Sequence, residues 1–381
     1  MSTRGFPKSE FEDRVARAQT KMVASGLQAL LLTTEPEIRY FTGFLTRFWE
    51  SPTRPWFVVL PSDRMPIAVI PSIGAHLMAQ TWITDIRTWV APDYSDDGIG
   101  LLSDTLREVT EEDGWIGLAG HTESRVGMPL ADFERLRTAL GTRALVSDQA
   151  ITQGLRLIKS PREIDKIQHA IQVAERAFDR VPEIASVGVP LSQVFRDFQR
   201  LGLEEGADWL PYLAGAAGIN GYGDVISPAS DAPLSRGDVL MLDTGLVWDG
   251  YFCDFDRNFA LGEPSDVVRS AHARLLGAVH AAFEAAKPGV LISDLFHAMT
   301  AVVGDKGAVG RLGHGLGMQL TEWPSIIAND HTPLAPGMVL TLEPAIETEP
   351  GKLLVHEENI VIREEGPAFL TTPAPAQILV L

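Results

Sequence analysis

The sequence predicts two domains, an α/β domain at the N-terminal end and an α+β domain after it. The first part of the chain alternates short apolar runs with helical patterns, as an α/β domain does. The second part groups helical patterns against strands that are expected to pair mostly antiparallel. Between them, Ser160-Pro161-Arg162-Glu163 has the form of a capping box with proline at the first helical position. We therefore expect domains at residues 1–153 and 154–381.

The N-terminal elements follow from the spacing of apolar residues. Residues 9–25 carry apolar residues at three- and four-residue steps, and Gly26 is placed to end this helix. The stretch 44–57 is rich in aromatic residues, proline and arginine and is expected to be a packed loop, in which Trp49 and Arg54 are candidates for substrate contact. Strands are expected at 27–33, 57–60, 67–70, 86–89 and 116–118, and helices near 35–40, 74–81, 98–110 and 129–140.

The C-terminal elements include a hairpin and a long amphipathic helix. Asp249-Gly250 is a strong hairpin signal between two strands. The helix that begins at Pro161 keeps isoleucines and other apolar residues on one face. Helices are expected at 161–178, 191–203, 264–286 and 293–303, and strands at 239–242, 251–260, 338–343 and 357–363.

Composition limits the classes of partner. The chain has 381 residues, of which 45% are hydrophobic and 22% charged, as is ordinary for a globular protein. Its net charge of −18 disfavours nucleic acid and anionic membranes as partners. Cys253 is the one cysteine, so no internal disulfide can form. The chain begins without signal-peptide character and has no run of about eighteen apolar residues, so we expect a cytoplasmic protein that spans no membrane.

Two aspartates stand where the core of a strand is expected. Asp243 follows the apolar run Val239–Leu242, and Asp254 stands among the aromatic residues of the next strand. A carboxylate at such a position is costly unless a cation neutralises it. A divalent metal ion would neutralise both. From this stretch alone, two strand-end acids that face water remain the alternative.

Three later segments offer partners for these aspartates. His314 has glycines on both sides, which let backbone approach an imidazole closely. Glu343 ends the apolar run Val339–Leu342, and Glu357 and Glu358 precede a β-branched strand. Each segment alone is consistent with a turn or a solvated strand end. Together they repeat one pattern, in which a strand brings a metal-binding side chain to a common point.

The motifs that share this pattern are Asp243-Thr244-Gly245, Gly250-Tyr251, Asp254 with Arg257 and Phe259, His314 in Gly-His-Gly-Leu-Gly, Glu343 in Leu-Glu-Pro and Glu358 in Glu-Glu-Asn-Ile-Val. In their order and spacing they resemble the creatinase/prolidase/methionine aminopeptidase family. The segments 154–167 and 40–44 also resemble the two-domain branch of prolidases and creatinases. The resemblance implies a C-terminal domain with the pita-bread fold, preceded by a smaller creatinase-like α/β domain.

The resemblance also implies that two divalent metal ions are bound by Asp243, Asp254, His314, Glu343 and Glu358. Four carboxylates and a neutral imidazole balance the charge of two such ions, and an oxygen-rich set with a single nitrogen suits Mn, Fe, Co or Zn. Two close ions can polarise a carbonyl and supply a nucleophile. The family's general base stands at Glu343. Of the adjacent Glu357 and Glu358, the spacing to Asn359 favours Glu358.

The chain departs from the family's peptidases at two histidines that hold the scissile carbonyl and the oxyanion. One of them falls seven residues after the metal-bound histidine, where Thr321 stands here, followed by Glu322. The other lies upstream of the first ligand, where Asp224 or Val225 stands. Loss of one oxyanion donor typically costs about a hundred- to a thousand-fold in rate.

Replacement donors would preserve a peptidase. Thr321, Tyr222 and His356 are the candidates, with Glu322 a further catalytic candidate beside Thr321 and Asp224 a substrate-binding one. The enzyme would then be a hydrolase of small substrates, acting on Xaa-Pro dipeptides or similar amide and imide bonds. The resemblance also implies a homodimer.

A different substrate is the alternative. Creatinase-type amidinohydrolases belong to this family. A lyase that acts on the sulfonium osmolyte dimethylsulfoniopropionate belongs to it as well, and Glu322-Trp323-Pro324 resembles the corresponding segment of that lyase. Trp323 and the loop with Trp49 could frame a cationic substrate through cation–π contact. A metal-binding but catalytically silent interaction module is a third class, which the intact ligand set disfavours.

Overall fold

The computed structural model describes residues 3–51, 53–304 and 310–381. Contacts divide the chain into two compact units, Thr3–Arg156 and Leu157–Leu381. The predicted boundary at residue 153 lies close to this division. No helix among the described residues has the length and apolar character needed to cross a membrane.

The N-terminal unit is built on a mixed six-stranded sheet in the order β4-β3-β2-β1-β5-β6. The strand β1 pairs antiparallel with β2 and parallel with β5, so it lies near the middle of the sheet and is buried along most of its length. The strands are β1 (Leu27–Leu32), β2 (Phe57–Pro61), β3 (Ile67–Pro71), β4 (Asp85–Trp89), β5 (Trp115–Leu118) and β6 (Ala144–Ser147).

The helices of this unit lie near their predicted positions. The helix α1 buries Phe11, Val15, Ala18 and Met22, which is the face that the sequence pattern predicts. Gly26, just beyond it, has a φ of +71°, as a residue that ends a helix often does. The helices are α1 (Lys8–Ala24), α2 (Glu35–Thr42), α3 (Ala75–Met78), α4 (Ile99–Val109), α5 (Leu130–Ala139) and α6 (Ile151–Leu157).

The C-terminal unit contains two larger sheets, in the orders β18-β10-β8-β7 and β12-β11-β13-β16-β17. The strand β9 pairs with β8, and β14 and β15 form a separate hairpin. The strands are β7 (Trp209–Ile219), β8 (Asp238–Trp248), β9 (Tyr251–Phe252), β10 (Phe255–Ala260), β11 (His314–Gly315), β12 (Glu322–Ser325), β13 (Val339–Leu342), β14 (Ala345–Glu349), β15 (Lys352–Val355), β16 (Glu358–Arg363), β17 (Gly366–Phe369) and β18 (Leu379–Val380).

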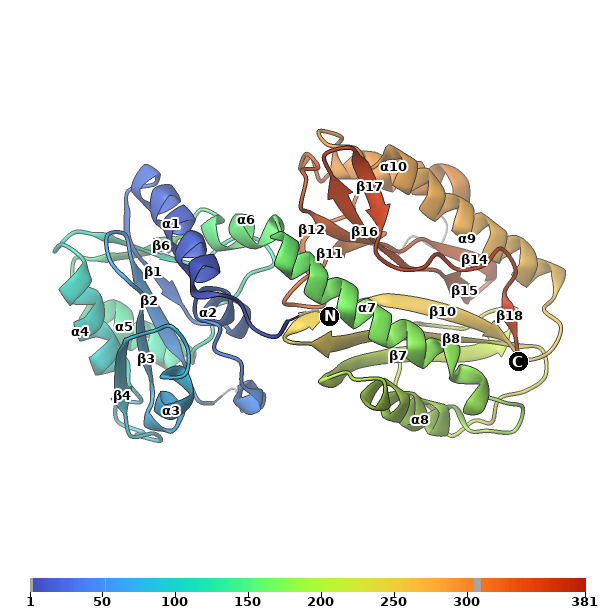
Figure 1. The fold of residues 1–381 in the computed structure, drawn as a ribbon, viewed down its shortest axis with the longest axis horizontal. Helices are drawn as coiled ribbons and strands as arrows, with labels where there is room; N and C mark the ends of the chain where they lie inside the picture. The colour runs from blue at the N-terminus through green and yellow to red at the C-terminus, as the bar shows by residue number, and fades with distance from the viewer. Residues whose placement is uncertain (1–2, 52, 305–309) are drawn as a thin grey trace. The chain divides into compact units, whose positions relative to one another are not determined.

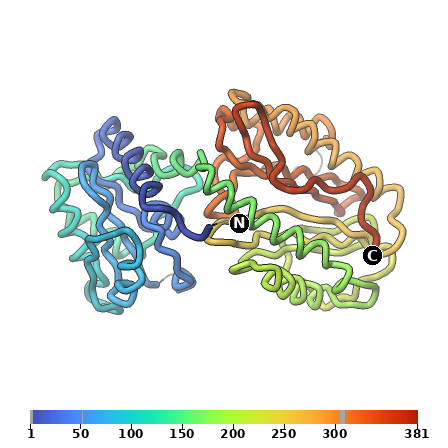
Figure 2. The backbone as a smooth tube through the Cα atoms, viewed as in Figure 1, coloured from blue at the N-terminus to red at the C-terminus, as the bar shows by residue number. Residues whose placement is uncertain are grey.

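Helices cover these two sheets. In Figure 1, α7 and α8 lie along the sheet that contains β8, and α9 and α10 lie along the sheet that contains β16. The same arrangement is visible in the backbone trace of Figure 2, where the green helices follow the yellow-green strands. Ser160 caps α7 by accepting a hydrogen bond from the Glu163 N–H, so the predicted capping box is present. The helices are α7 (Pro161–Asp179), α8 (Leu191–Glu204), α9 (Asp266–Ala285) and α10 (Ile292–Val303).

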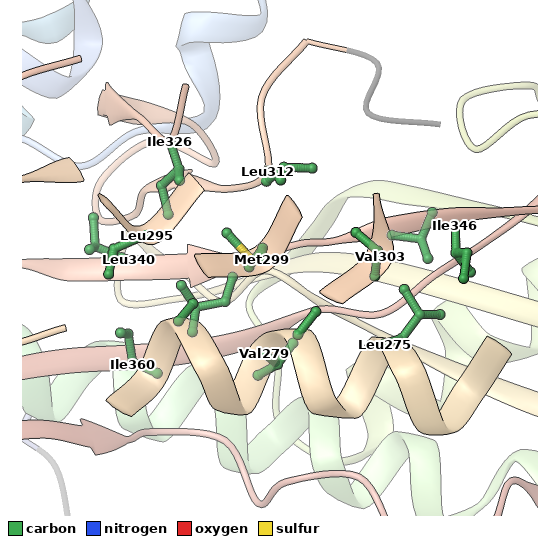
Figure 3. Packing of buried hydrophobic residues seen from close by; sticks show 14 of the residues in the cluster. Leu275, Val279, Leu295, Met299, Val303, Leu312, Ile326, Leu340, Ile346 and Ile360 are labelled. Atoms are coloured by element: carbon green, nitrogen blue, oxygen red, sulfur yellow. The ribbon is translucent and has the colours of Figure 1, made fainter. Parts of the chain in front are cut away.

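An apolar core joins α9 and α10 to the second sheet. Figure 3 shows Leu275 and Val279 of α9 and Met299 of α10 packed towards Leu340 of β13 and Ile360 of β16. These residues are almost fully buried. Burial of large aliphatic side chains contributes about 1.5–3 kcal/mol each, so this core holds the strands that carry the site described below.

The predicted hairpin is present and longer than expected. Asp249 and Gly250 have φ values of +49° and +78°, so both turn residues adopt the left-handed region that suits a two-residue hairpin. The strand β8 is buried along its whole length from Asp238 to Trp248, whereas the sequence pattern predicts only residues 239–242. The pattern stops short because Asp243 interrupts the apolar run.

Candidate metal centre

Each sheet of the C-terminal unit delivers acidic or imidazole side chains to one buried region. From the first sheet, Asp243 lies within β8, and Asp254 lies in the link between β9 and β10. From the second sheet, His314 begins β11, Glu343 follows β13 directly, and Glu357 directly precedes β16. All are buried except Glu343, which is half-buried. The strands therefore bring together residues that are widely separated in the sequence.

Asp254, His314 and Glu357 form the tightest part of this cluster. One potential ligand atom from each lies within 4.8 Å of the others. His314 Nε2 lies 3.3 Å from Asp254 Oδ2, and His314 Nδ1 lies 2.9 Å from the Gly315 carbonyl oxygen. Because a carbonyl can only accept, Nδ1 carries a proton there. In the neutral ring, Nε2 then presents a lone pair towards the Asp254 carboxylate, as a metal-binding histidine would.

Asp243 and Glu357 have oxygens that suit metal ligation. Asp243 Oδ1 and Glu357 Oε1 are buried without a hydrogen-bond partner. The other Asp243 oxygen, Oδ2, accepts a hydrogen bond of 3.1 Å from the Tyr212 hydroxyl. An unpartnered buried carboxylate oxygen costs stability unless a cation binds it. These orphaned oxygens and the nitrogen lone pair of His314 therefore fit the divalent ions that the family implies.

The pKa values of the carboxyl groups in the cluster also indicate a site for cations. Burial and the charges of Asp254 and Glu343 raise the pKa of Asp243 well above its usual value. Burial and the same two charges raise the pKa of Glu357. Burial, reinforced by the charge of Asp254, raises the pKa of Glu343 to about 7. Carboxylates that share a site in this way resist ionising together unless cations balance them.

Glu358, which the sequence reasoning places among the ligands, is turned away from the cluster. Its Oε2 lies 3.1 Å from Arg257 Nη2, and its Oε1 lies 3.1 Å from His356 Nε2 and accepts a hydrogen bond of 2.8 Å from the Ala374 N–H. Although burial opposes it, the charges of Arg257 and His356 lower the pKa of Glu358 to about 2. Neighbouring residues along an extended chain point to opposite sides, and Glu357 is the residue whose side chain points into the cluster. The geometry thus favours Glu357 over the predicted Glu358.

His356 belongs to the layer behind the ligands. Its Nδ1 lies 3.3 Å from Asp256 Oδ1 and its Nε2 lies 3.1 Å from Glu358 Oε1. Burial would lower the pKa of His356, but the neighbouring carboxylates of Asp256 and Glu358 raise it to about 9. Both ring nitrogens of His356 thus lie next to carboxylates. The geometry therefore does not favour His356 as a replacement donor to a substrate.

The glycines around His314 are required by close backbone contacts. A Cβ on Gly313 would lie 2.3 Å from the Thr341 carbonyl oxygen, and the φ of Gly313 is +134°. A Cβ on Gly315 would lie 2.6 Å from the Trp323 carbonyl oxygen. The sequence interpretation of these glycines as positions of close approach is thus supported by the packing of β11 against its neighbours.

Thr321, Glu322 and Trp323 follow His314 in the loop and strand after β11, and they have different surroundings. Thr321 is half-buried, and its hydroxyl accepts a hydrogen bond of 3.1 Å from Arg311. Glu322 pairs with Lys159 Nζ at 3.0 Å and accepts hydrogen bonds from two backbone N–H groups. Trp323 packs against the apolar core. The contacts of Glu322 therefore favour a structural role, and catalytic roles for Thr321 and Glu322 stay predictions.

The hydrogen bonds that the structure shows for the side chains of Tyr222 and Asp224 go to residues outside the cluster. Tyr222 is fully buried; its hydroxyl donates to Asn258 Oδ1 and accepts from the Val355 N–H. Asp224 is exposed and accepts hydrogen bonds from the Ile226 and Ser227 N–H groups. Their contacts favour structural roles, in the core and in a turn respectively.

Trp49 and Arg54 belong to the N-terminal unit. Trp49 lies in a short 3₁₀ helix, η1 (Arg47–Glu50), and packs against Phe44 and Trp56 with ring centroids 6.5 and 5.8 Å away. Arg54 is half-buried and donates a long hydrogen bond of 3.5 Å to the Thr53 carbonyl. The stretch is a packed aromatic segment, as expected, and substrate contact by these two residues stays a prediction.

Tyr212 is the neighbour of the cluster that sequence reasoning missed. It lies in β7, whose register places it opposite Gly245 of β8, close to Asp243. Burial and the charges of Asp243 and Asp254 raise the pKa of Tyr212, so it remains protonated and able to donate. No local motif marks this tyrosine. Tyr212 could have been identified from the sequence only if a further strand, paired with β8, had been predicted at its position.

Comparisons with known proteins agree with this geometry. Residues 165–364 match the model of metallopeptidase family M24, and residues 14–158 match the creatinase/prolidase N-terminal domain. The probable dipeptidase PepE of Mycobacterium bovis is 29% identical over 388 residues, covering 100% of this chain and 99% of that protein. The Xaa-Pro dipeptidase of Pyrococcus furiosus is 30% identical over 225 residues, covering 58% of this chain and 65% of that protein.

Similarity extends to solved structures. The crystal structure of the dipeptidase PepE from Mycobacterium ulcerans superimposes with a TM-score of 0.85 at 27% identity, covering 98% of this chain and 99% of that one. The match spans both units, so the expected pita-bread domain and its creatinase-like N-terminal partner are confirmed. This chain belongs to metallopeptidase family M24 and is a metal-dependent hydrolase.

Proposed function

We propose that this enzyme hydrolyses the C–N bond of a small peptide-like substrate, with Xaa-Pro dipeptides as the preferred class. The observation that carries the proposal is the buried cluster of Asp254, His314 and Glu357, whose ligand atoms lie within 4.8 Å of one another. Relatives that are named dipeptidase and Xaa-Pro dipeptidase support the substrate class. The family's peptidases keep two histidines that this chain lacks, so the substrate requires a direct test.

Two divalent ions are proposed to be bound by Asp243, Asp254, His314, Glu343 and Glu357. Glu357 replaces Glu358 in this set because its inward oxygen is orphaned, whereas Glu358 is paired with Arg257. An oxygen-rich set with one imidazole suits Mn, Fe, Co or Zn. When bound, such ions polarise a carbonyl and lower the pKa of water.

The protein's own groups are proposed to do the remaining chemistry. Glu343 follows β13 at the edge of the cluster and is half-buried, so its carboxylate can accept a proton from water and return it to the leaving nitrogen. Tyr212 orients Asp243 through its hydroxyl. The outer network of Arg257, His356 and Glu358 fixes the strand from which Glu357 projects.

A substrate panel tests this proposal. Metal-reconstituted enzyme is offered Xaa-Pro dipeptides, amidino or N-methyl amino acids, and sulfonium or betaine compounds, with Asp254→Asn as the matched inactive control. We expect turnover of Xaa-Pro dipeptides that the control lacks. Turnover confined to either of the other two sets would replace the peptidase assignment. Metal binding without turnover of any set would place the substrate outside these three classes.

The assembly and location are also proposals. A homodimer is proposed from the family resemblance, and sedimentation velocity would test it. A cytoplasmic location is proposed, and the single Cys253, which is buried and unpaired, is consistent with it. Fractionation of the native host would decide the location.

A further inference from the structure

Arg311 and Thr321 lie on either side of His314 in the sequence and meet in space. Arg311 Nη2 donates a hydrogen bond of 3.1 Å to Thr321 Oγ1. Both side chains are half-buried. Leu312, next to Arg311, is fixed to the sheet because its N–H donates to the Ile326 carbonyl and its carbonyl accepts from the Glu343 N–H. The backbone beside Arg311 is thus bonded to the same residue, Glu343, that borders the ligand cluster.

The hydrogen bonds of this segment place Arg311 next to the second sheet. Its neighbour Leu312 is bonded to Glu343 through the Leu312 carbonyl, and Arg311 itself is bonded to Thr321. Because its side chain is half-buried, part of it remains accessible.

We propose that Arg311 and Thr321 act as a joint donor to the scissile carbonyl oxygen of the substrate. This inference rests on the proposed function and names the groups that take over from the missing histidines. Arg311 polarises the Thr321 hydroxyl by donating to its oxygen, which leaves the hydroxyl hydrogen free to donate onward. Remaining guanidinium N–H groups offer a second, charged donor.

Hydrolysis of the C–N bond needs a hydrogen-bond donor at the carbonyl oxygen. As the oxygen of water bonds to the carbonyl carbon, the carbonyl oxygen takes up the electron pair of its π bond. That pair returns when the C–N bond breaks, and the departing nitrogen takes the electron pair of that bond and a proton. A charged donor that is already oriented stabilises the intermediate oxyanion more than the neutral carbonyl, so its effect appears mainly in kcat.

Two other roles for Arg311 give different results. It could bind the terminal carboxylate of a dipeptide, in which case its loss would matter only for substrates with that carboxylate. It could instead only hold the loop that carries Thr321, in which case metal content or unfolding would change with activity. The experiment therefore compares a dipeptide with its C-terminal amide and measures metal content beside the kinetics.

The test uses metal-loaded wild type, Arg311→Gln, Arg311→Lys and Thr321→Val, with Arg363→Gln as a control at an exposed arginine of the same unit. We expect Arg311→Gln to lower kcat about a hundred- to a thousand-fold on both dipeptide and amide, with KM and metal content little changed. Arg311→Lys keeps the charge without the planar fork and should retain intermediate activity. Thr321→Val should lower kcat about tenfold or more, and Arg363→Gln should behave as wild type.

A binding measurement separates this inference from the proposed function. The probe is a phosphinic dipeptide analogue whose tetrahedral phosphorus replaces the scissile carbonyl, titrated calorimetrically into each metal-loaded variant. We expect wild type to bind it at least about a hundredfold more tightly than Arg311→Gln. Equal binding, or a loss of kcat confined to the free-carboxylate substrate, would overturn this inference alone. Failure of wild type both to cleave Xaa-Pro dipeptides and to bind the analogue would overturn the proposed function as well.

Discussion

Lys159 and Glu322 form a buried ion pair in which Nζ lies 3.0 Å from Oε2. The two side chains are only 2% and 6% exposed, so neither charge is solvated. Glu322 also accepts hydrogen bonds from the N–H groups of Met318 and Gln319. The pair therefore connects the segment before α7 to the loop that follows His314.

Removal of one partner of this pair should destabilise the C-terminal unit strongly. Lys159→Met removes the cation that lies 3.0 Å from the buried Glu322 carboxylate, and loss of one partner of a buried ion pair typically costs about 3–5 kcal/mol. The double variant Lys159→Met/Glu322→Gln should recover a large part of the loss because the charge of Glu322 is removed as well. Urea denaturation of the three proteins measures this. A Lys159→Met variant within about 0.5 kcal/mol of wild type would contradict the importance of the pair.

Replacement of the two adjacent glutamates should have opposite consequences for metal binding. Glu357→Gln should lose at least one equivalent of metal because its inward oxygen is a ligand in our proposal. Glu358→Gln should keep the metal but lower stability by about 1–3 kcal/mol, because Arg257 loses a charged, buried partner. Elemental analysis after dialysis, together with thermal unfolding, distinguishes them. Metal loss in Glu358→Gln alone would restore the ligand set expected from the sequence.

The metal-free protein should become less stable as the pH rises from about 4.5 to 7. The pKa of Glu343 in the folded state is raised from 4.5 to about 7, chiefly by burial, so the folded form holds a proton that the unfolded form releases in this range. Stability from such a group is full below its unfolded pKa and is lost as the pH passes through the folded value. Each such proton contributes up to about 1.4 kcal/mol per pH unit. Denaturant unfolding of chelator-treated protein across this range measures the slope.

Two checks accompany this pH dependence. Glu343→Gln removes the titrating group and should flatten the slope. In metal-loaded protein the slope should also flatten, because binding releases the protons, which calorimetry in two buffers of different ionisation enthalpy would count. A metal-free protein that gains stability over the same range would show that these carboxyl groups are not protonated in the folded state.

A methyl group at Gly313 should displace His314. In Gly313→Ala, the new Cβ would lie 2.3 Å from the Thr341 carbonyl oxygen, in addition to the strain of a φ of +134°. Strained backbone of this kind alone costs about 1–3 kcal/mol, so we expect a larger loss than that, accompanied by loss of metal. Gly289→Ala is the matched control, since Gly289 has a φ of +87° with nothing within 4 Å of its Cβ position. Equal losses in the two variants would leave strain, and not crowding, as the cause.

Removal of the Tyr212 hydroxyl should weaken metal binding without unfolding the protein. The hydroxyl donates to Asp243 Oδ2 at 3.1 Å, and partners of metal ligands typically contribute about 10- to 100-fold in metal affinity. Tyr212→Phe should therefore bind metal more weakly by that factor. Tyr222→Phe serves as the comparison because its hydroxyl bonds to Asn258 and to the Val355 N–H, neither of which is a proposed ligand; it should lower stability and leave metal affinity unchanged. Competition with a chromogenic chelator measures both.

Local features of the sequence predict much of this structure. The turn at Asp249-Gly250, the cap at Ser160 and the glycines around His314 each depend on backbone geometry that only a few residue types permit, and each is present. The family fold followed from the same motifs. These features can be predicted from the sequence because the residues that determine each of them lie close together in the chain.

Long-range partners explain what the sequence could not predict. Glu357 and Glu358 are equivalent in a sequence pattern, and only Arg257 shows which of them faces outward. Glu322 resembles a catalytic acid until Lys159 is found beside it. Tyr212 reaches Asp243 only through strand pairing. In each case the deciding contact joins residues that no local spacing relates.

The location of the proposed ligands has a consequence for how this enzyme could be redesigned. Glu343 and Glu357 lie at the immediate ends of strands that are braced by the core of Figure 3, and Asp243 lies within the buried strand β8. Thr321 lies in the connection between β11 and β12, which is outside those strands. Directed evolution confined to this connection could therefore explore new substrates while the catalytic metals stay in place, so a library there should yield more soluble, metallated variants than one of equal size in β8.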